Sequence, residues 1–220
     1  MSTVRRERAS CRFREAKEGR TPGKIAKRLN ADNIPSACGS VCPANPGPAY
    51  YPSERVIVMP PEFVQLVADV LIQSELVDTQ EDLETQATAI TAFVFLHEIG
   101  HALVDQLEIP ITGKEEDAVD QLATVVVTDA GTIAISAASL FGAFAADREA
   151  FDEADFWDEH SLDEQRFFNL LCWVYGADPT VHGEIAELGI GEQRLARCEE
   201  EFAQIQTSWA ILLDPYLKTG

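Results

Sequence analysis

One long helical segment, apolar on nearly every side, constrains the fold of this chain most strongly. The residue pattern predicts a helix over Thr79–Leu107, and the side chains in its middle, Ala89–Leu96, are apolar almost all the way round. Because such a helix cannot turn any face of its middle towards water, other elements must cover it. The sequence therefore predicts a domain built around a buried central helix.

The chain after Pro61 has helical periodicity almost to its end. The further predicted helices are Glu62–Leu76, a segment that begins near Glu115 and runs to about Ala130, Thr132–Ala145, Leu162–Tyr175 and Gly191–Leu213. Ahead of them, the β-branched run Arg55–Met59 predicts a short strand, and Ala49–Tyr51 is a candidate for its hairpin partner. We therefore predict an α+β fold that is predominantly helical and has a small sheet or hairpin.

Charge divides the chain into two parts. The net charge is −20, but residues 1–28 carry +7 and residues 29–220 carry −27. The basic part has few large apolar side chains, so we predict a flexible arm over 1–28 and one folded domain over 29–220. The acidic domain should repel nucleic acid, and only the arm could bind it, but we favour the interpretation of the arm as a solubility tail.

Neither export nor a disulfide pattern follows from the sequence. No signal peptide is visible in the first 30 residues, and the longest uncharged run, Ala130 to Ala146, is too short and too rich in small residues for a membrane span. We expect that run to form a buried helix and predict no transmembrane segment. Cys38 and Cys42 could bridge each other or pair with Cys172 and Cys198, and the sequence does not choose between these pairings.

The motif with the clearest chemistry, HEIGH, lies inside the long helix. His97 and His101 are four residues apart, so both imidazoles lie on one helix face and can bind one metal ion. Neutral imidazole is a favoured ligand of Zn²⁺. Glu98 lies beside that face, where it can accept a proton from a water molecule that the zinc has made acidic. Gly100 lies between the ligands and would allow close packing, for example against a strand.

A third ligand is expected a short distance downstream, in KEEDAVD. Glu116 and Asp120 share a helical face, so we predict that Glu116 binds the metal and that Asp120 accepts a hydrogen bond from a ligand histidine. Glu115 would instead form a capping box with Thr112. The alternative is that these acidic residues form a solvated first turn that the helix dipole favours.

These segments resemble a known family. HEIGH followed by EEDAVDQLA is similar to zincins whose third ligand is a glutamate. The resemblance is closer to a family of HExxH metallopeptidases catalogued as a domain of unknown function, through Cys38-Gly39, Tyr51-Pro52, HEIGHAL, ITGKEEDAVDQLA, FWDEHSLDEQRFFNLLCWVYGADP and RCEEEF. It covers about residues 34–213 and implies a zincin-like metallopeptidase core within 29–220. It also implies that relatives are commonly exported, whereas this chain has a charged arm instead of a signal peptide, so its localisation stays open.

A second histidine segment, Trp157–Arg166, follows the predicted metal ligands. We predict that His160 stabilises the oxyanion of the reaction intermediate, with Arg166 and Tyr175 as weaker candidates. The alternative is a surface histidine beside two acids.

The leading hypothesis is a zinc-dependent peptidase that cleaves peptide or protein substrates, with the edge of the Arg55–Met59 strand holding an extended substrate. The alternative hypothesis is a metal-binding regulatory or partner-binding protein with little or no turnover. A third hypothesis, a DNA-associated regulator, rests on the basic arm alone.

Overall fold

The computed structural model describes residues 47–217, all of which belong to one compact unit, Cys38–Gly220. The predicted arm over 1–28, its boundary with the domain, Cys38 and Cys42 lie outside the described residues.

The described residues form a two-stranded hairpin followed by six α-helices. Their order is β1 (Ala49–Tyr51), β2 (Val56–Val58), α2 (Pro61–Gln73), α3 (Gln80–Gln106), α4 (Glu115–Val126), α5 (Thr132–Asp147), α6 (Asp163–Ala177) and α7 (Glu192–Leu213). Short 3₁₀ turns occur at Thr128–Ala130, Glu153–Phe156, Gly183–Glu187 and Asp214–Tyr216. The prediction of a predominantly helical α+β fold with a small sheet is confirmed.

The hairpin is antiparallel and places Tyr50 opposite Ile57. The predicted strand Arg55–Met59 is shorter than expected, because Arg55 has a φ of 56° and belongs to the turn. Pro61 then begins α2 as its first residue, where the absence of an N–H costs no helical hydrogen bond.

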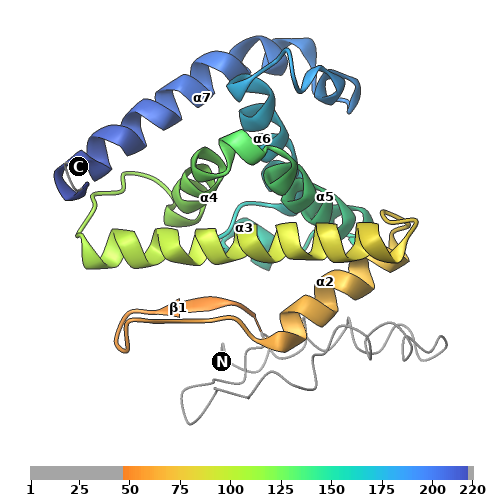
Figure 1. Ribbon diagram of the computed structural model, residues 1–220, viewed down its shortest axis with the longest axis horizontal. Helices are drawn as coiled ribbons and strands as arrows, with labels where there is room; N and C mark the ends of the chain where they lie inside the picture. Colours follow the sequence, from red (N-terminus) through yellow and green to blue (C-terminus); the bar gives the residue numbers. More distant parts are fainter. Residues whose placement is uncertain (1–46, 218–220) are drawn as a thin grey trace. The chain divides into compact units, whose positions relative to one another are not determined.

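Helix α3 is the central element (Figure 1). The hairpin lies on one side of it, and α4 and α5 lie on the other. Thr79 caps its beginning by accepting a hydrogen bond from the N–H of Asp82. Ile90 and Phe93 are fully buried, but Phe95 is 43% exposed. The prediction that other elements cover the middle of this helix on every side is therefore wrong for the described residues.

By length and hydropathy α3 could also cross a membrane, a criterion that core helices satisfy as well. Here α3 packs against α2, α4 and α5. The run from Ala130 to Ala146, which the sequence assigned to a buried helix, forms most of α5.

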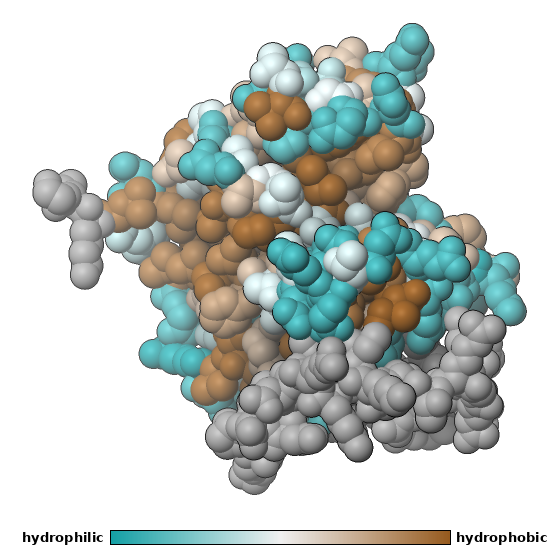
Figure 2. Space-filling model, turned by 45° about the vertical axis from the view of Figure 1, so that its right-hand side comes forward, coloured by the Kyte–Doolittle hydropathy of each residue, from teal (hydrophilic) through white to brown (hydrophobic). Residues whose placement is uncertain are grey.

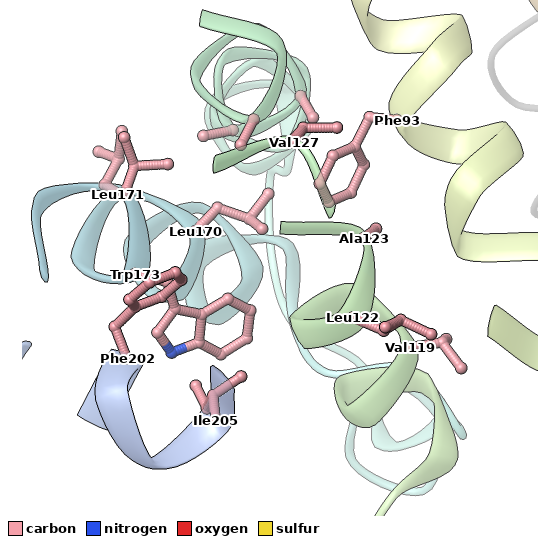
Figure 3. Close-up of a cluster of buried hydrophobic side chains, with 14 of the residues drawn as sticks. Phe93, Val119, Leu122, Ala123, Val127, Leu170, Leu171, Trp173, Phe202 and Ile205 are labelled. Atoms are coloured by element: carbon pink, nitrogen blue, oxygen red, sulfur yellow. The ribbon is translucent and has the colours of Figure 1, made fainter. Parts of the chain in front are cut away.

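The hydrophobic core lies where α4, α5, α6 and α7 meet (Figure 3). Leu170 and Trp173 of α6 pack near Phe202 and Ile205 of α7. A disulfide between Cys172 and Cys198 joins the same two helices and decides one pairing that the sequence left open. Apolar packing and the disulfide therefore both hold α6 against α7.

Some apolar side chains reach the surface, and Figure 2 shows brown apolar areas next to hydrophilic ones on one face. Phe156 and Trp157 are exposed in the connection between α5 and α6. Arg148 holds this connection by ion pairs with Asp155 and Asp163 at 2.9 Å each. The connection also contains His160, which it brings to the site described next.

Candidate metal centre

Helix α3 presents two imidazoles side by side. The Nε2 atoms of His97 and His101 are 3.2 Å apart, and the rings meet edge to face. Gly100 lies between them in sequence, and a Cβ there would come within 2.7 Å of the Cβ of Val119 on α4. Close packing at Gly100 was expected, but its partner is a helix and not a strand. The missing side chain allows α4 to approach the two imidazoles.

Helix α4 contributes a carboxylate to the same point. Oε2 of Glu116 lies 3.1 Å from Nε2 of His97 and 3.4 Å from Nε2 of His101. The three side chains each offer one ligand atom, and these atoms all lie within 4.8 Å of one another. The structure thus brings together the three residues that the sequence proposed as metal ligands.

The donor set suits a divalent cation. Oε2 of Glu116 is buried and has no hydrogen bond of acceptable geometry from the described residues, although imidazole nitrogens surround it. A buried carboxylate oxygen without a hydrogen bond is costly unless a cation satisfies it. Two imidazole nitrogens and one carboxylate oxygen are a common protein ligand set for catalytic zinc. The residues present therefore fit the metal that the sequence predicts.

A second layer of carboxylates orients the imidazoles. Nδ1 of His97 lies 2.7 Å from Oδ1 of Asp120, and Nδ1 of His101 lies 2.8 Å from Oε1 of Glu115. Because each Nδ1–H donates to a carboxylate, each neutral ring keeps its Nε2 lone pair for a metal. Arg166 in turn donates to both oxygens of Asp120, from Nε at 2.8 Å and Nη2 at 2.9 Å.

One expectation about this layer is wrong, and the two weaker candidates for the oxyanion role have other contacts. Glu115 does not form a capping box with Thr112, because α4 begins after Lys114 without a side-chain cap and the Glu115 carboxylate contacts His101. The guanidinium of Arg166 binds Asp120 and stacks 3.9 Å from the ring centre of Phe141. Tyr175 packs against the hydrophobic core.

The cluster favours positive charge at its centre. Burial alone would lower the pKa of His97, but the carboxylates of Asp120 and Glu116 outweigh it and raise this pKa to about 9. Burial alone would raise the pKa of Glu116, but the neighbouring imidazoles hold it far below its ordinary value. Burial opposes ionisation of Asp120 too, yet Arg166 and His97 keep its pKa low. The carboxylates stay ionised, and the imidazoles attract protons or a metal cation.

Glu98 directly follows His97 in α3 and is only 6% exposed. Its Oε2 accepts a hydrogen bond of 2.7 Å from the backbone N–H of Tyr50 in β1. Strand β1 thus supplies a backbone hydrogen bond to Glu98, whereas the predicted substrate edge along Arg55–Met59 belongs to the other strand of the hairpin.

His160, in the connection between α5 and α6, lies close to the carboxylate of Glu116. Its Nε2 lies 3.0 Å from Oε2 of Glu116, and its Nδ1 lies 3.1 Å from Oδ1 of Asp158. Its side chain is 43% exposed, against 6% for His97. Lys114 fixes this segment by donating to the backbone carbonyls of Asp158 and His160. Of the three imidazoles around Glu116, that of His160 is the most exposed to solvent.

Comparison with known proteins agrees with this geometry. The model of one protein family, DUF4344, which is described as "Putative metallopeptidase", matches residues 33–213, more than four fifths of the chain. The chain belongs to this family. No curated protein and no solved structure shows significant similarity to it. Membership in a metallopeptidase family implies a hydrolase that acts on peptides or proteins, and the metal-ligand cluster lies within the matched residues.

Proposed function

We propose that this protein is a zinc-dependent peptidase. The observation that carries the proposal is the convergence of His97, His101 and Glu116 on one point, with the carboxylate of Glu98 on the adjacent helix face. His97 and His101 would bind Zn²⁺ through Nε2, and Glu116 would bind it through a carboxylate oxygen. Asp120 and Glu115 would hold the two rings in the ligand tautomer.

Each residue has a separate role in hydrolysis. When bound, zinc supplies Lewis acidity that polarises the scissile carbonyl and acidifies a water molecule. Glu98 is the general base that removes the proton of the attacking water and then delivers a proton to the leaving amine. Its buried position favours proton transfer to a group held close by, because bulk water does not compete there.

His160 is proposed to stabilise the oxyanion. Glu116 raises the pKa of His160 although burial opposes this, so the imidazole tends to carry the proton that an oxyanion stabiliser must donate. Its exposure also leaves it accessible to a bound peptide. A ligand role is the competing assignment, and zinc content separates the two: His160→Gln should retain stoichiometric zinc and lower kcat by about 100-fold. Loss of the zinc would assign His160 to the ligand set instead.

The central experiment compares zinc content with turnover. The purified full chain should contain one zinc per molecule and hydrolyse an unstructured protein such as casein. Glu98→Gln should retain the zinc and lose at least about 1,000-fold in kcat, because the base is removed and the ligands are not. A variant with both His97→Ala and His101→Ala should lose zinc and activity together.

One observation favours the alternative, a metal-binding regulatory protein with little or no turnover. Glu98 is nearly inaccessible, and one of its oxygens already accepts a hydrogen bond from Tyr50. The same experiment decides between the two functions. A zinc-loaded wild-type chain that cleaves no peptide would support the regulatory function and contradict the peptidase.

A further inference from the structure

We propose that Tyr50 positions Glu98 for proton transfer, an inference that rests on the proposed peptidase function. Tyr50 and Glu98 are 48 residues apart, and the backbone N–H of Tyr50 donates to Oε2 of Glu98 at 2.7 Å. This is a hydrogen bond between a rigid backbone donor and a side chain of the proposed reaction centre. Through this hydrogen bond the β-hairpin would hold the Glu98 carboxylate, a role that neither the metal ligands nor the helices supply.

Tyr50 contacts α3 at a second point through its side chain. Its hydroxyl donates to Oδ2 of Asp105 at 2.7 Å and accepts from Nε2 of Gln106 at 2.8 Å. Glu98 and Asp105 are seven residues apart, so they lie on nearly the same face of α3 and about 10 Å apart along its axis. One residue of β1 therefore spans two turns of α3, with its backbone at Glu98 and its hydroxyl at Asp105.

The geometry of the hairpin leaves this backbone N–H available. In an antiparallel pair, residues alternate between exchanging hydrogen bonds with the partner strand and pointing away from it. Tyr50 is paired with Ile57 in register, and its N–H points away from β2 towards Glu98. The hairpin can therefore hold Glu98 without losing a hydrogen bond between its own strands.

Glu98 needs such an anchor. The terminal torsion of a glutamate side chain is soft, so its carboxylate rotates easily when nothing holds it. With Oε2 held by Tyr50, the other oxygen, Oε1, accepts no hydrogen bond from residues 47–217. One oxygen is thus fixed, and the other is left to take the proton. Small errors in such an orientation are costly, because a displacement of about 1 Å can reduce a rate by about 100-fold.

Removing the hydroxyl anchor tests the inference in the full zinc-loaded chain. Tyr50→Phe keeps the backbone N–H but loses the bonds to Asp105 and Gln106, so β1 is held less firmly against Glu98. We expect kcat to fall about tenfold, KM to change less than twofold and zinc content to stay the same. Tyr51→Phe is the matched control, since it removes a neighbouring hydroxyl on the same strand, and it should leave kcat unchanged.

Two variant pairs separate positioning from a loss of folding. Asp105→Asn retains an acceptor for the hydroxyl and should restore most of the activity that Asp105→Ala loses. Tyr50→Pro and Tyr50→Ala both lack the hydroxyl, but only the proline variant lacks the N–H, so its kcat should be at least about fivefold lower at equal zinc content.

The outcomes distinguish this inference from the proposed function. If the wild type hydrolyses casein, Glu98→Gln does not, and Tyr50→Phe matches the wild type in kcat, then Tyr50 does not position Glu98 and the peptidase assignment stands. If kcat per zinc-loaded molecule is unchanged while only the melting temperature falls, Tyr50 has a structural role alone. A zinc-loaded wild type without turnover overturns both proposals.

Discussion

Asp120 shows how one buried residue can set the geometry of a site that it does not enter. Its Oδ1 accepts hydrogen bonds from His97 and Arg166, its Oδ2 accepts another from Arg166, and the residue is almost fully buried. Arg166 compensates its charge and holds it in place, and Asp120 in turn holds the His97 ring. The orientation of a proposed metal ligand on α3 therefore depends on an arginine of α6.

This arrangement predicts the effect of Asp120→Asn. The amide nitrogen of asparagine cannot accept the hydrogen bond that Arg166 donates to Oδ2, so Arg166 should no longer hold this side chain and the His97 ring should lose its fixed tautomer and orientation. We expect zinc affinity to fall about 10- to 100-fold, measured by competition with a chromophoric chelator. Asp117→Asn removes an acid from the same turn of α4 and should leave the affinity unchanged. Equal affinities in the two variants would show that Asp120 does not orient the ligand.

At the scale of elements, the site depends on how closely α3 and α4 approach. Their contact at Gly100 and Val119 brings Glu116 of α4 to the two imidazoles of α3. A Cβ at position 100 would also lie 3.3 Å from the Cα of Val119, so the side chain of Val119 alone could not relieve the overlap. The distance between the two helices decides whether three ligands reach one ion.

Gly100→Ala tests this dependence. Alanine favours a helix by about 1 kcal/mol over glycine, but the overlap with Val119 forces α4 away, and overpacking of this kind costs about 1–3 kcal/mol. We expect a small net loss of stability and a loss of zinc affinity of at least about tenfold, measured by calorimetric titration. Gly113→Ala, where a Cβ meets nothing within 4 Å, is the control and should bind zinc as the wild type does.

At the scale of the whole molecule, acid should weaken the contact between α6 and α7. Glu201 accepts hydrogen bonds from Arg194 at 2.6 and 2.8 Å and from Trp173 at 2.7 Å. Burial would raise the pKa of Glu201, but Arg194 and Trp173 outweigh it and lower this pKa below its ordinary value of 4.5. A lowered pKa in the folded state means that Glu201 stabilises the fold above pH 4.5 and loses this effect as the pH falls below it.

Glu201→Gln should therefore be about 1 kcal/mol less stable than the wild type at pH 6, and this difference in stability should be smaller at pH 3. Urea unfolding at both pH values, with the disulfide intact, measures the difference. Glu200→Gln removes an exposed acid at the neighbouring position, and its difference in stability from the wild type should not change between pH 6 and pH 3. If the difference in stability between Glu201→Gln and the wild type is the same at both pH values, the assigned role of Glu201 is contradicted.

The sequence by itself determined the features that depend on local geometry. The spacing of His97 and His101 puts both rings on one helix face wherever that helix lies, and Glu116 and Asp120 share a face for the same reason. Hydrophobic periodicity likewise predicted the helices, and a β-branched run predicted a short strand with a candidate hairpin partner. These patterns repeat over three or four residues, so they can be read without knowing the neighbours in space.

Only the tertiary structure decided which distant groups meet. No local pattern connects Tyr50 with Glu98 or Arg166 with Asp120, and Glu115 fits a helix cap by sequence as well as it fits its contact with His101. The pairing of Cys172 with Cys198 depends in the same way on how α6 packs against α7. Such contacts result from the packing of whole helices, which many residues of the core determine together.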